Sequence, residues 1–428
     1  MSSTRIQAEL TWVDGSFHRD IEVVIDGEGR FASVTPESDG PVTHPGKAIL
    51  PGFVNAHSHA FQRGLRGRGE HFPRDAEDFW TWREAMYGLV ESMNADRLME
   101  LSCAAFREMR RAGMTTVGEF HYLHHVVGED PFAADRIMLD AAKEVGIRMV
   151  LLSAHYTHGG FGRSLSGGQC RFDTRDLDTY WDAFDSLSSV LGPDQTMGVV
   201  AHSLRAVPLD AVVDLHAEAR RRGLVMHLHI EEQRREIEEC LAATGSTPTR
   251  LLLDRLDPGD ECTAVHATHT APEDLDAWLD RGCGVCLCPL TEANLGDGFP
   301  DRPRMLSHRG AIAIGSDSNS RISMLEEMRM LELSHRLRDE ARGAWRDDDG
   351  RIDGVLLDMA TVGGARSLGI DAGRIASGAL ADLVLVDLHS DSLQHIDPDS
   401  LGAGLVLGAD REAIVGTCVG GRWELPTQ

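Results

Sequence analysis

The sequence predicts an α/β protein, with a (β/α)8 TIM barrel as its larger part and a small β-sandwich formed by both chain termini as its smaller part. Three observations support this fold class. Short apolar runs alternate with longer helical stretches through the middle of the chain. The two ends instead alternate apolar and polar residues around turns, and titratable side chains repeatedly follow the apolar runs. We expect residues 1–50 and 371–428 to form the β-sandwich and residues 51–370 to form the barrel.

The terminal segments have the pattern of β-hairpins. Residues 21–25 are followed by the turn Asp26-Gly27 and then by a second run at 31–34. Near the other end, apolar runs lie at 381–386 and 413–419. Strand-like runs bounded by turn residues are typical of antiparallel β structure. Because such segments flank a long middle part, they predict one β domain assembled from both chain ends.

The middle of the chain contains about eight strand candidates. They lie around residues 53–56, 115–119, 149–154, 198–201, 224–229, 263–267, 285–288 and 311–315. Helical stretches lie between them, for example at 95–112, 209–222, 234–244 and 323–339. Strand–helix alternation repeated about eight times is the pattern of a (β/α)8 barrel.

Composition excludes several classes of function. The chain has 428 residues and a formal net charge of -26, which repels nucleic acid and anionic lipid. The first residues lack the apolar stretch of a signal peptide, and no apolar run is long enough to span a bilayer. The eight cysteines are scattered, and Cys283, Cys286 and Cys288 are expected to be buried strand residues rather than a zinc site. We expect a reduced, cytoplasmic protein.

The first barrel strand ends in the most informative motif of the chain, Pro-Gly-Phe-Val-Asn-Ala-His-Ser-His, at residues 51–59. Alternate side chains of a strand share a face, so His57 and His59 point the same way, as two ligands of one metal ion must. An isolated pair of this kind is weak evidence. Further titratable residues follow other strands, where the active sites of such barrels lie: Glu119 and His121, His202, His229, His266 and Asp317.

Three neutral imidazoles and one carboxylate suit a divalent ion such as zinc, although Fe²⁺ accepts the same ligands. We assign His57, His59, His229 and Asp317 as ligands of one such ion. His227 shares a strand face with His229 but lies deeper, where a hydrogen-bonded histidine is expected.

A bound divalent ion lowers the pKa of its water towards 7, and hydrolysis then needs a base for the water and an acid for the leaving group. Asp317 and His266 are the candidates for the base. Glu232, three residues after His229, is the candidate for proton transfer to a leaving nitrogen. As alternatives, Glu232 is a favourable carboxylate in the first turn of the next helix, and His266 is a structural core residue.

Four segments together resemble the amidohydrolase superfamily: residues 51–59, 229–232, 265–266 and 315–317. The resemblance implies a metal-dependent barrel with a β-sandwich, over essentially the whole chain. Many members carry two metals bridged by a carboxylated lysine at the end of the fourth strand. Here that strand ends in Ala201-His202, and the two lysines of the chain, Lys47 and Lys143, are remote from it in sequence. A single metal with a His-x-x-Glu pattern resembles the deaminase branch, which releases ammonia.

Longer segments resemble the formimidoylglutamate deiminase family of histidine degradation. They cover residues 57–63, 119–125, 229–233 and 288–298. The resemblance implies hydrolysis of N-formimidoyl-L-glutamate to N-formyl-L-glutamate and ammonia, and a homodimer. It also implies that the substrate is contacted by Gln62, Arg83, Tyr122, His202 and Arg205. Asn319 stands where many members have histidine, so the lip of the site is expected to differ.

The chemistry of this substrate agrees with the implied residues. Carboxylates that enter a dry pocket need strong donors, and arginine supplies them in a bidentate fork. Arg83 and Arg205 would bind the dicarboxylate, and Glu232 would face the cationic formimidoyl group; ordinary surface ion pairs are the alternative for both arginines. Two rival functions stay open. A purine deaminase would favour stacking aromatics and amides, whereas a non-catalytic scaffold would have no need of the ligand set.

Overall fold

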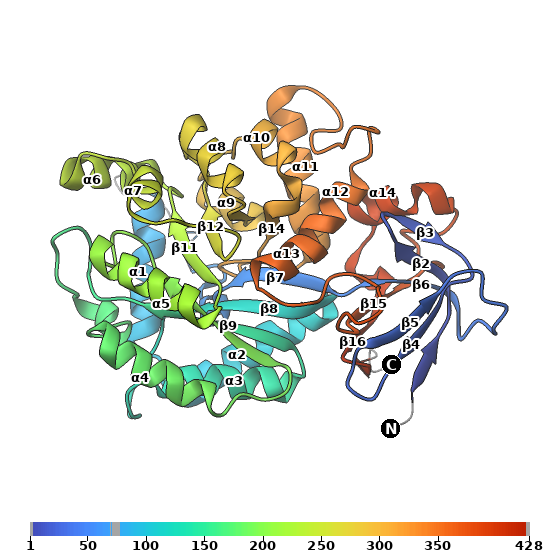
Figure 1. Cartoon of the computed structure of the whole chain (residues 1–428), viewed down its shortest axis with the longest axis horizontal. Coiled ribbons are helices and arrows are strands. Elements are labelled where there is room, and N and C mark those ends of the chain that lie inside the picture. Colours follow the sequence, from blue (N-terminus) through green and yellow to red (C-terminus); the bar gives the residue numbers. More distant parts are fainter. Residues whose placement is uncertain (1–2, 69, 71–77, 425–428) are drawn as a thin grey trace.

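The computed structural model describes residues 3–68, 70 and 78–424. A barrel surrounded by helices makes up most of the molecule, and a smaller β region lies at one side of it (Figure 1). Both termini lie in this smaller region. The arrangement confirms the predicted fold class.

Eight parallel strands form the barrel and follow one another in sequence order. Their bounds are β7 (Phe53–Ser58), β8 (Met114–His121), β9 (Arg148–His155), β10 (Gln195–Ala201), β11 (Met226–Ile230), β12 (Cys262–His266), β13 (Gly284–Leu287) and β14 (Ile312–Ile314). Every strand expected from the apolar runs is present. Helices cover the barrel outside and side chains fill it inside, so its strands are buried on both faces and read as continuous apolar runs.

The barrel closes beyond the end of β14, which has only three residues. The N–H of Asp317 donates to the carbonyl of His57 at 3.0 Å, and the N–H of His59 donates to the carbonyl of Asp317 at 2.9 Å. Gly315 permits this approach, because a Cβ there would lie 2.6 Å from the Cβ of His57. Closure therefore brings His57, His59 and Asp317 together at the C-terminal ends of the strands.

The described residues form fourteen α-helices, most of which surround the barrel, while α14 lies beside the β region (Figure 1). They are α1 (Asp78–Glu91), α2 (Ala95–Arg111), α3 (Ala133–Val145), α4 (Leu177–Ser188), α5 (Leu209–Arg222), α6 (Arg234–Thr244), α7 (Pro248–Arg255), α8 (Pro272–Asp280), α9 (Pro289–Leu295), α10 (Arg302–Ser307), α11 (Met324–Asp339), α12 (Asp353–Asp358), α13 (Gly364–Ser367) and α14 (Pro398–Gly408). Five short helical segments of other types are η1 (Ala60–Leu65), η2 (Gly167–Arg171), η3 (Arg309–Ala311), η4 (Met359–Gly363) and η5 (Arg411–Ala413). The four helical stretches named from the sequence correspond to α2, α5, α6 and α11.

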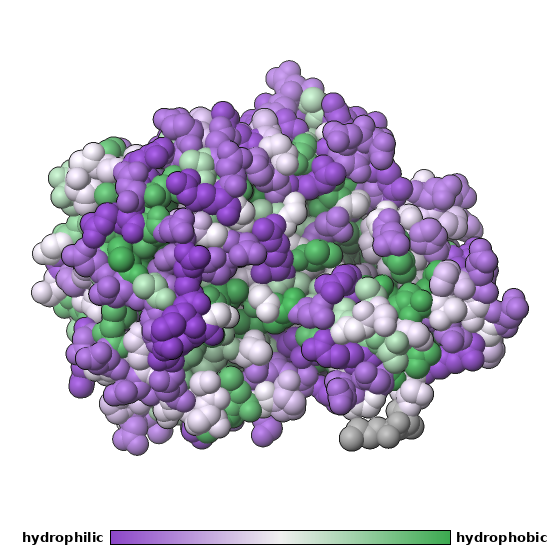
Figure 2. Space-filling model, viewed as in Figure 1, coloured by the Kyte–Doolittle hydropathy of each residue, from purple (hydrophilic) through white to green (hydrophobic). Residues whose placement is uncertain are grey.

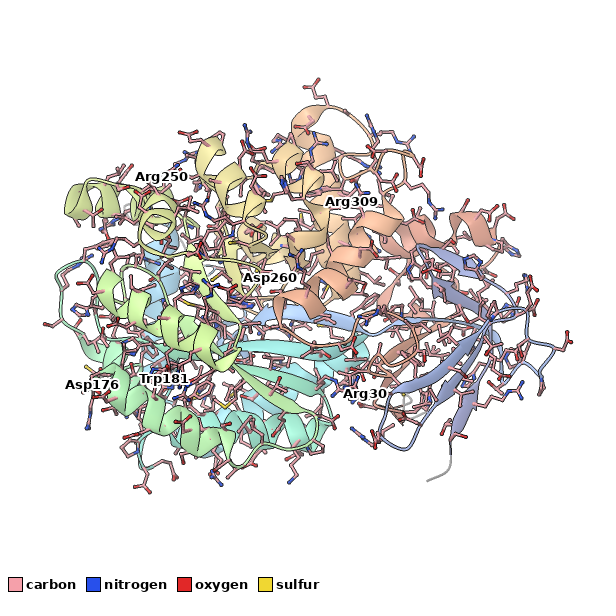
Figure 3. The ribbon with its side chains drawn as sticks, in the orientation of Figure 1. Arg30, Asp176, Trp181, Arg250, Asp260 and Arg309 are labelled. Atoms are coloured by element: carbon pink, nitrogen blue, oxygen red, sulfur yellow. The ribbon has the colours of Figure 1, made fainter. Side chains whose placement is uncertain are left out.

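Local side-chain chemistry explains where several helices begin. Asn94 and Ser323 precede α2 and α11, and each side chain accepts a hydrogen bond from a first-turn N–H. Asp176 does the same for α4, the helix that also carries Trp181 (Figure 3). Such caps satisfy N–H groups that have no partner within the helix. The amphipathic pattern of α2 then buries Leu98, Phe106 and Met109, among others, against the barrel.

The β region contains two sheets. One has the order β1 (Thr4–Ile6), β4 (Glu22–Ile25), β5 (Phe31–Thr35), and the other has the order β17 (Arg422–Glu424), β16 (Ile414–Val419), β15 (Leu383–Asp387), β6 (His44–Pro51), β2 (Ala8–Val13), β3 (Ser16–His18). Strand β15, from the C-terminal part of the chain, pairs directly with β6 from the N-terminal part. A second hydrophobic core includes Ile6, Phe31, Ile49 and Leu383.

The eight cysteines are free thiols, and seven of them, including Cys283, Cys286 and Cys288, are buried as expected. Within the described ranges, no helix combines the length and the hydropathy needed to cross a bilayer. Hydrophilic side chains cover much of the face seen in Figure 2.

A buried ion pair joins the barrel to the β region. Arg148, at the start of β9, contacts Asp382 through two bonds, of 2.8 Å from Nε and 3.0 Å from a terminal nitrogen. The two side chains are only 8% and 1% exposed. Asp382 also accepts the N–H of Gly420, so its charge is satisfied from both parts of the molecule.

We expect Arg148→Met to destabilise the protein by about 3–5 kcal/mol, because it leaves the carboxylate of Asp382 buried without its partner. The shift in the urea unfolding midpoint measures this effect. Arg107→Met is the matched control, since it breaks an exposed pair with Glu144 that contributes about 0–1 kcal/mol. Equal shifts for the two variants would contradict the prediction.

Candidate active site

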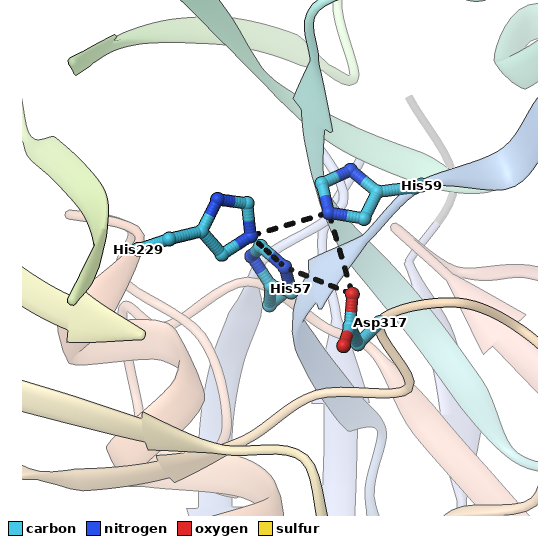
Figure 4. Close-up of side chains that lie close together, drawn as sticks. All are labelled: His57, His59, His229 and Asp317. Atoms are coloured by element: carbon cyan, nitrogen blue, oxygen red, sulfur yellow. Dashed lines mark hydrogen bonds and ion pairs between the residues drawn. The ribbon is translucent and has the colours of Figure 1, made fainter. Parts of the chain in front are cut away.

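The four proposed metal ligands converge at the point of barrel closure. His57 lies in β7 and His59 just beyond it, His229 lies in β11, and Asp317 follows β14. Nε2 of His229 lies 3.2 Å from Nε2 of His57 and 3.3 Å from that of His59. Oδ1 of Asp317 lies 3.4 Å and 3.3 Å from the same two nitrogens (Figure 4). All four side chains are buried.

This donor set fits one divalent ion. Four ligands at zinc bond lengths of about 2.0–2.1 Å in a tetrahedron lie roughly 3.3 Å apart, which matches the separations seen here. Burial lowers the pKa of His57, that of His59 to about 3, and that of His229 well below its ordinary value. The neutral rings therefore present lone pairs. Nδ1 of His59 lies 2.7 Å from the carbonyl of Phe120, to which it donates, leaving Nε2 for a metal.

His227, the competing histidine of β11, has a different environment. Its Nε2 lies 2.8 Å from the carbonyl oxygen of Ser367, to which it can donate. It is fully buried, and burial lowers its pKa to about 4. His227 is thus the hydrogen-bonded interior histidine that the sequence indicated.

The three proposed proton-transfer residues line one cavity. Nε2 of His266 lies 3.9 Å from Oε1 of Glu232 and 3.8 Å from Oδ2 of Asp317. The helix after Glu232 does not depend on it for a cap, because Gln233 occupies the cap position of α6. Its neighbour Glu231 instead binds the first turn of α7 through Thr249. Glu232 therefore lies before the first turn of α6, whose acidic residue is Glu236, and lines the cavity.

The carboxylates around His266 change its protonation. Burial raises the pKa of Glu232, and Asp317 raises it further. Burial lowers the pKa of His266, but the charges of Glu232 and Asp317 and a hydrogen bond to Glu292 outweigh burial and raise it well above its ordinary value. The protonation of His266 is therefore linked to that of the carboxylates beside it.

The strand ends that carry these groups have unusual backbone conformations. Positive φ angles occur at Glu231 (53°), His266 (74°), Ala267 (50°), Asp317 (49°) and Asn319 (56°). Residues other than glycine rarely adopt positive φ angles, and each one that does costs of the order of 1–3 kcal/mol of conformational free energy. Their gathering around one cavity is typical of a functional site.

Four of the five residues expected to bind substrate also line this cavity: Gln62, Tyr122, His202 and Arg205. Nε2 of Gln62 donates to the hydroxyl of Tyr122 at 2.6 Å. Nε of Arg205 and Oε1 of Gln62 are buried without a hydrogen-bond partner among the described residues. Within the described residues, Nε of Arg205 thus has no anion bonded to it, although the charges of Glu236 and Glu232 lie near enough to raise the pKa of its guanidinium. Arg83 belongs to α1, but its side chain lies outside the described part of the structure.

Sequence reasoning missed several residues of the cavity wall, including Trp82, Tyr87, Tyr156, Arg163 and Phe172. Tyr156 directly follows β9, so the strand-end rule that identified His202 could have found it. Its ring lies 4.7 Å from that of His202, edge to face. Trp82 and Tyr87 come from α1, and Arg163 comes from a loop; the sequence carries no comparable signal for them.

Asn319 supports the fold and does not lie at the lip of the site. It is fully buried, and its side chain bonds to Ser58 at 3.1 Å and to Ser316 at 2.7 Å. Asn55 bonds to Ser316 as well, at 2.7 Å and 2.8 Å. These amides and hydroxyls join β7 to the segment after β14 and so support barrel closure.

Comparison with known proteins finds relatives that match nearly the whole chain. Residues 48–423 match the amidohydrolase family. The formimidoylglutamate deiminase of Pseudomonas aeruginosa is 36% identical over 427 residues, 98% of this chain and 94% of that protein. A 5-methylthioadenosine/S-adenosylhomocysteine deaminase of Natronomonas pharaonis is 28% identical over 415 residues, 93% of this chain and 88% of that protein.

A crystal structure of an amidohydrolase from Brucella melitensis superposes with a TM-score of 0.87 at 32% identity, covering 98% of this chain and 94% of that one. Sequence and fold thus agree over nearly the whole chain. The protein belongs to the amidohydrolase family and is a hydrolase that acts on C–N bonds.

Proposed function

We propose that this enzyme hydrolyses N-formimidoyl-L-glutamate to N-formyl-L-glutamate and ammonia, a step of histidine degradation. The observation that carries the proposal is Arg205, a cation with a buried and unpartnered Nε in the same cavity as the metal-ligand set. The 36% identity to a formimidoylglutamate deiminase over almost the full chain supports the same substrate.

In this proposal His57, His59, His229 and Asp317 hold one divalent ion, most simply zinc; Fe²⁺ is compatible with the same donors. When bound, such an ion would lower the pKa of a water molecule and so make hydroxide available near neutral pH. The neutral rings and the ionised carboxylate suit a cation, because their lone pairs are free to bind it, whereas protonated rings would offer none.

The chain's own groups handle the protons. Oδ2 of Asp317 and Nε2 of His266, 3.8 Å apart, take the proton of the attacking water. The water oxygen forms a bond to the formimidoyl carbon. The bond from that carbon to its terminal nitrogen then breaks, while the oxygen loses its second proton and becomes the formyl carbonyl, so that both protons of the water end on the nitrogen. Glu232, 3.9 Å from His266, delivers the proton to the departing nitrogen, which leaves as ammonia.

We propose separate residues for orienting the substrate. We propose that Arg205 binds one carboxylate of the substrate, and Arg83 the other. A guanidinium that already lies in a partly buried site gains more from a carboxylate than one in water does. Gln62 and Tyr122, joined by their 2.6 Å hydrogen bond, would contact the same end of the substrate with His202. Glu232 would also favour the cationic formimidoyl group.

The second candidate is deamination of an adenosine-like base, favoured by the 28% identity to a nucleoside deaminase and by the aromatic residues of the cavity wall. Several of these rings contact one another edge to face. Tyr122 and Phe172 have centroids 4.8 Å apart at 79°, and Tyr122 and His202 lie 5.0 Å apart at 89°. These rings pack against one another in the wall of the cavity, whereas Arg205 favours binding of an anion. The dicarboxylate is therefore the better match.

Ammonia release by the zinc-loaded protein tests the substrate. We expect rapid release from N-formimidoyl-L-glutamate and none from guanine or 5′-methylthioadenosine, because only the first offers a carboxylate to the unpartnered Nε of Arg205. Activity on a base with silence on the dicarboxylate would leave the metal chemistry standing and refute the roles of Arg83 and Arg205.

We expect His229→Gln to lose zinc through dialysis against a chelator, while His227→Gln retains it, because only the first removes one of the converging donors. The loss in zinc affinity should exceed the roughly 10–100-fold typical of removing a partner outside the ligand set. Elemental analysis of the dialysed proteins measures it. Equal zinc content in the two variants would refute the ligand assignment.

Arg205→Ala should lower kcat/KM for the dicarboxylate by a factor that corresponds to about 2–5 kcal/mol, since it removes one partner of a buried charge pair. Arg163→Ala is the control, because Arg163 also lines the cavity but is 56% exposed and pairs with Glu239. Steady-state kinetics should show at most a small loss for the control. The assignment fails if the two variants lose the same amount.

A further inference from the structure

Glu292 is a buried carboxylate beside the cavity that the mechanism above does not use. It belongs to α9, which follows β13, and it is only 4% exposed. Its Oε1 lies 3.2 Å from Nδ1 of His266 and accepts the N–H of Cys288 at 2.9 Å. One carboxylate oxygen thus contacts both an imidazole of the site and the backbone of a neighbouring strand end.

This contact determines which nitrogen of His266 faces the site. A carboxylate oxygen at Nδ1 accepts a proton from it, so Nδ1 carries the hydrogen. Nε2 then points between Glu232 and Asp317, at 3.9 Å and 3.8 Å. The other neutral tautomer would place a lone pair against the lone pairs of Glu292. A carboxylate behind a catalytic histidine has the same effect in hydrolytic triads.

We propose that Glu292 is a positioning residue, which holds His266 in the tautomer and orientation that direct Nε2 at the reacting water and at Glu232. The inference rests on the proposed role of His266 and deepens it. Backbone structure fixes the positions of both residues. His266 ends β12 with a φ angle of 74°. The N–H of Glu292 donates to the carbonyl of Cys288 at 2.9 Å. The ring is therefore constrained from both sides.

The alternative is that Glu292 only stabilises the first turn of α9, and the chain contains a matched control for it. Glu327, on α11, is fully buried, and its Oε2 accepts the N–H of Leu290 in the same turn at 2.8 Å. Both carboxylates therefore bind the start of α9. Of the two, Glu292 makes the contact with His266, so a comparison of their variants separates positioning from helix support.

The test compares E292A, E292Q, E327A and E327Q as zinc-loaded full-length proteins. We expect E292A to lower kcat about 10–100-fold at unchanged KM, the usual effect of removing an orienting partner. E292Q should lose less, because the N–H of Cys288 keeps an amide oxygen in place to accept the Nδ1 hydrogen. The Glu327 variants should keep the native kcat, and in an H266A background E292A should add no further loss.

Long-range ¹H–¹⁵N spectra of the histidine rings give a readout independent of turnover. The signals that H266Q removes should show a protonated Nδ1 in the native protein and in E292Q, and a changed pattern in E292A. Equal losses in E292A and E327A, a change in KM alone, or an unchanged ring pattern in E292A would overturn the inference.

The proposed substrate can be wrong while the proposed role of Glu292 is right, and the two failures can be distinguished. If the native protein released no ammonia from N-formimidoyl-L-glutamate, the same variants would be compared on the base that it does deaminate. Zinc content and thermal midpoints identify any variant that is misfolded, and E292Q then stands in for E292A.

Discussion

The backbone pairing of Asp317 with His57 and His59 is the contact on which the site depends. Strand β14 is short, and the ring of parallel strands closes only where the following segment meets β7. The two hydrogen bonds of this closure, 3.0 Å and 2.9 Å long, join the chain segments that carry three of the four candidate metal ligands. Fold closure and ligand convergence are therefore one constraint, and Gly315, Asn55 and Asn319 all serve it.

The net charge of the whole molecule is opposite in sign to the charge of Arg205 in the cavity. The formal net charge of -26 would repel an anionic substrate. Fields of exposed charges, however, fade within about 8–10 Å at physiological salt. Inside the cavity, the guanidinium of Arg205 has no anion bonded to its Nε within the described structure. In the proposed function this local charge, rather than the net charge of the molecule, would attract the substrate.

The buried carboxylates near the site have different tasks that their residue type does not reveal. Glu231 holds the start of α7, Glu232 faces the cavity, and Glu292 contacts both His266 and the start of α9. All three are acidic residues close to strand ends in sequence. Their contacts differ, and the proposed roles of Glu232 in proton transfer and of Glu292 in orienting His266 rest on those contacts.

The strand-end residues were predictable, because parallel strands place their C-terminal ends at one edge and His-x-His puts two rings on one face. That reasoning identified the four candidate ligands, His266 and His202. The same rule applied to β9 and β13 would have added Tyr156 and drawn attention to the segment that contains Glu292. It could not have identified Trp82 or Arg163, which reach the cavity from a helix and a loop whose paths depend on packing.

The sequence by itself determined the order of strands and helices, the β region built from both termini and the identity of the metal-ligand candidates. Periodicity and spacing are local properties, and each of these conclusions needs only local geometry. Only the tertiary structure shows that the side chain of Asn319 joins β7 to the segment after β14, that Tyr156 lies against His202, and that Glu292 contacts His266. These outcomes depend on distances between residues far apart in the chain, which only the closed barrel specifies.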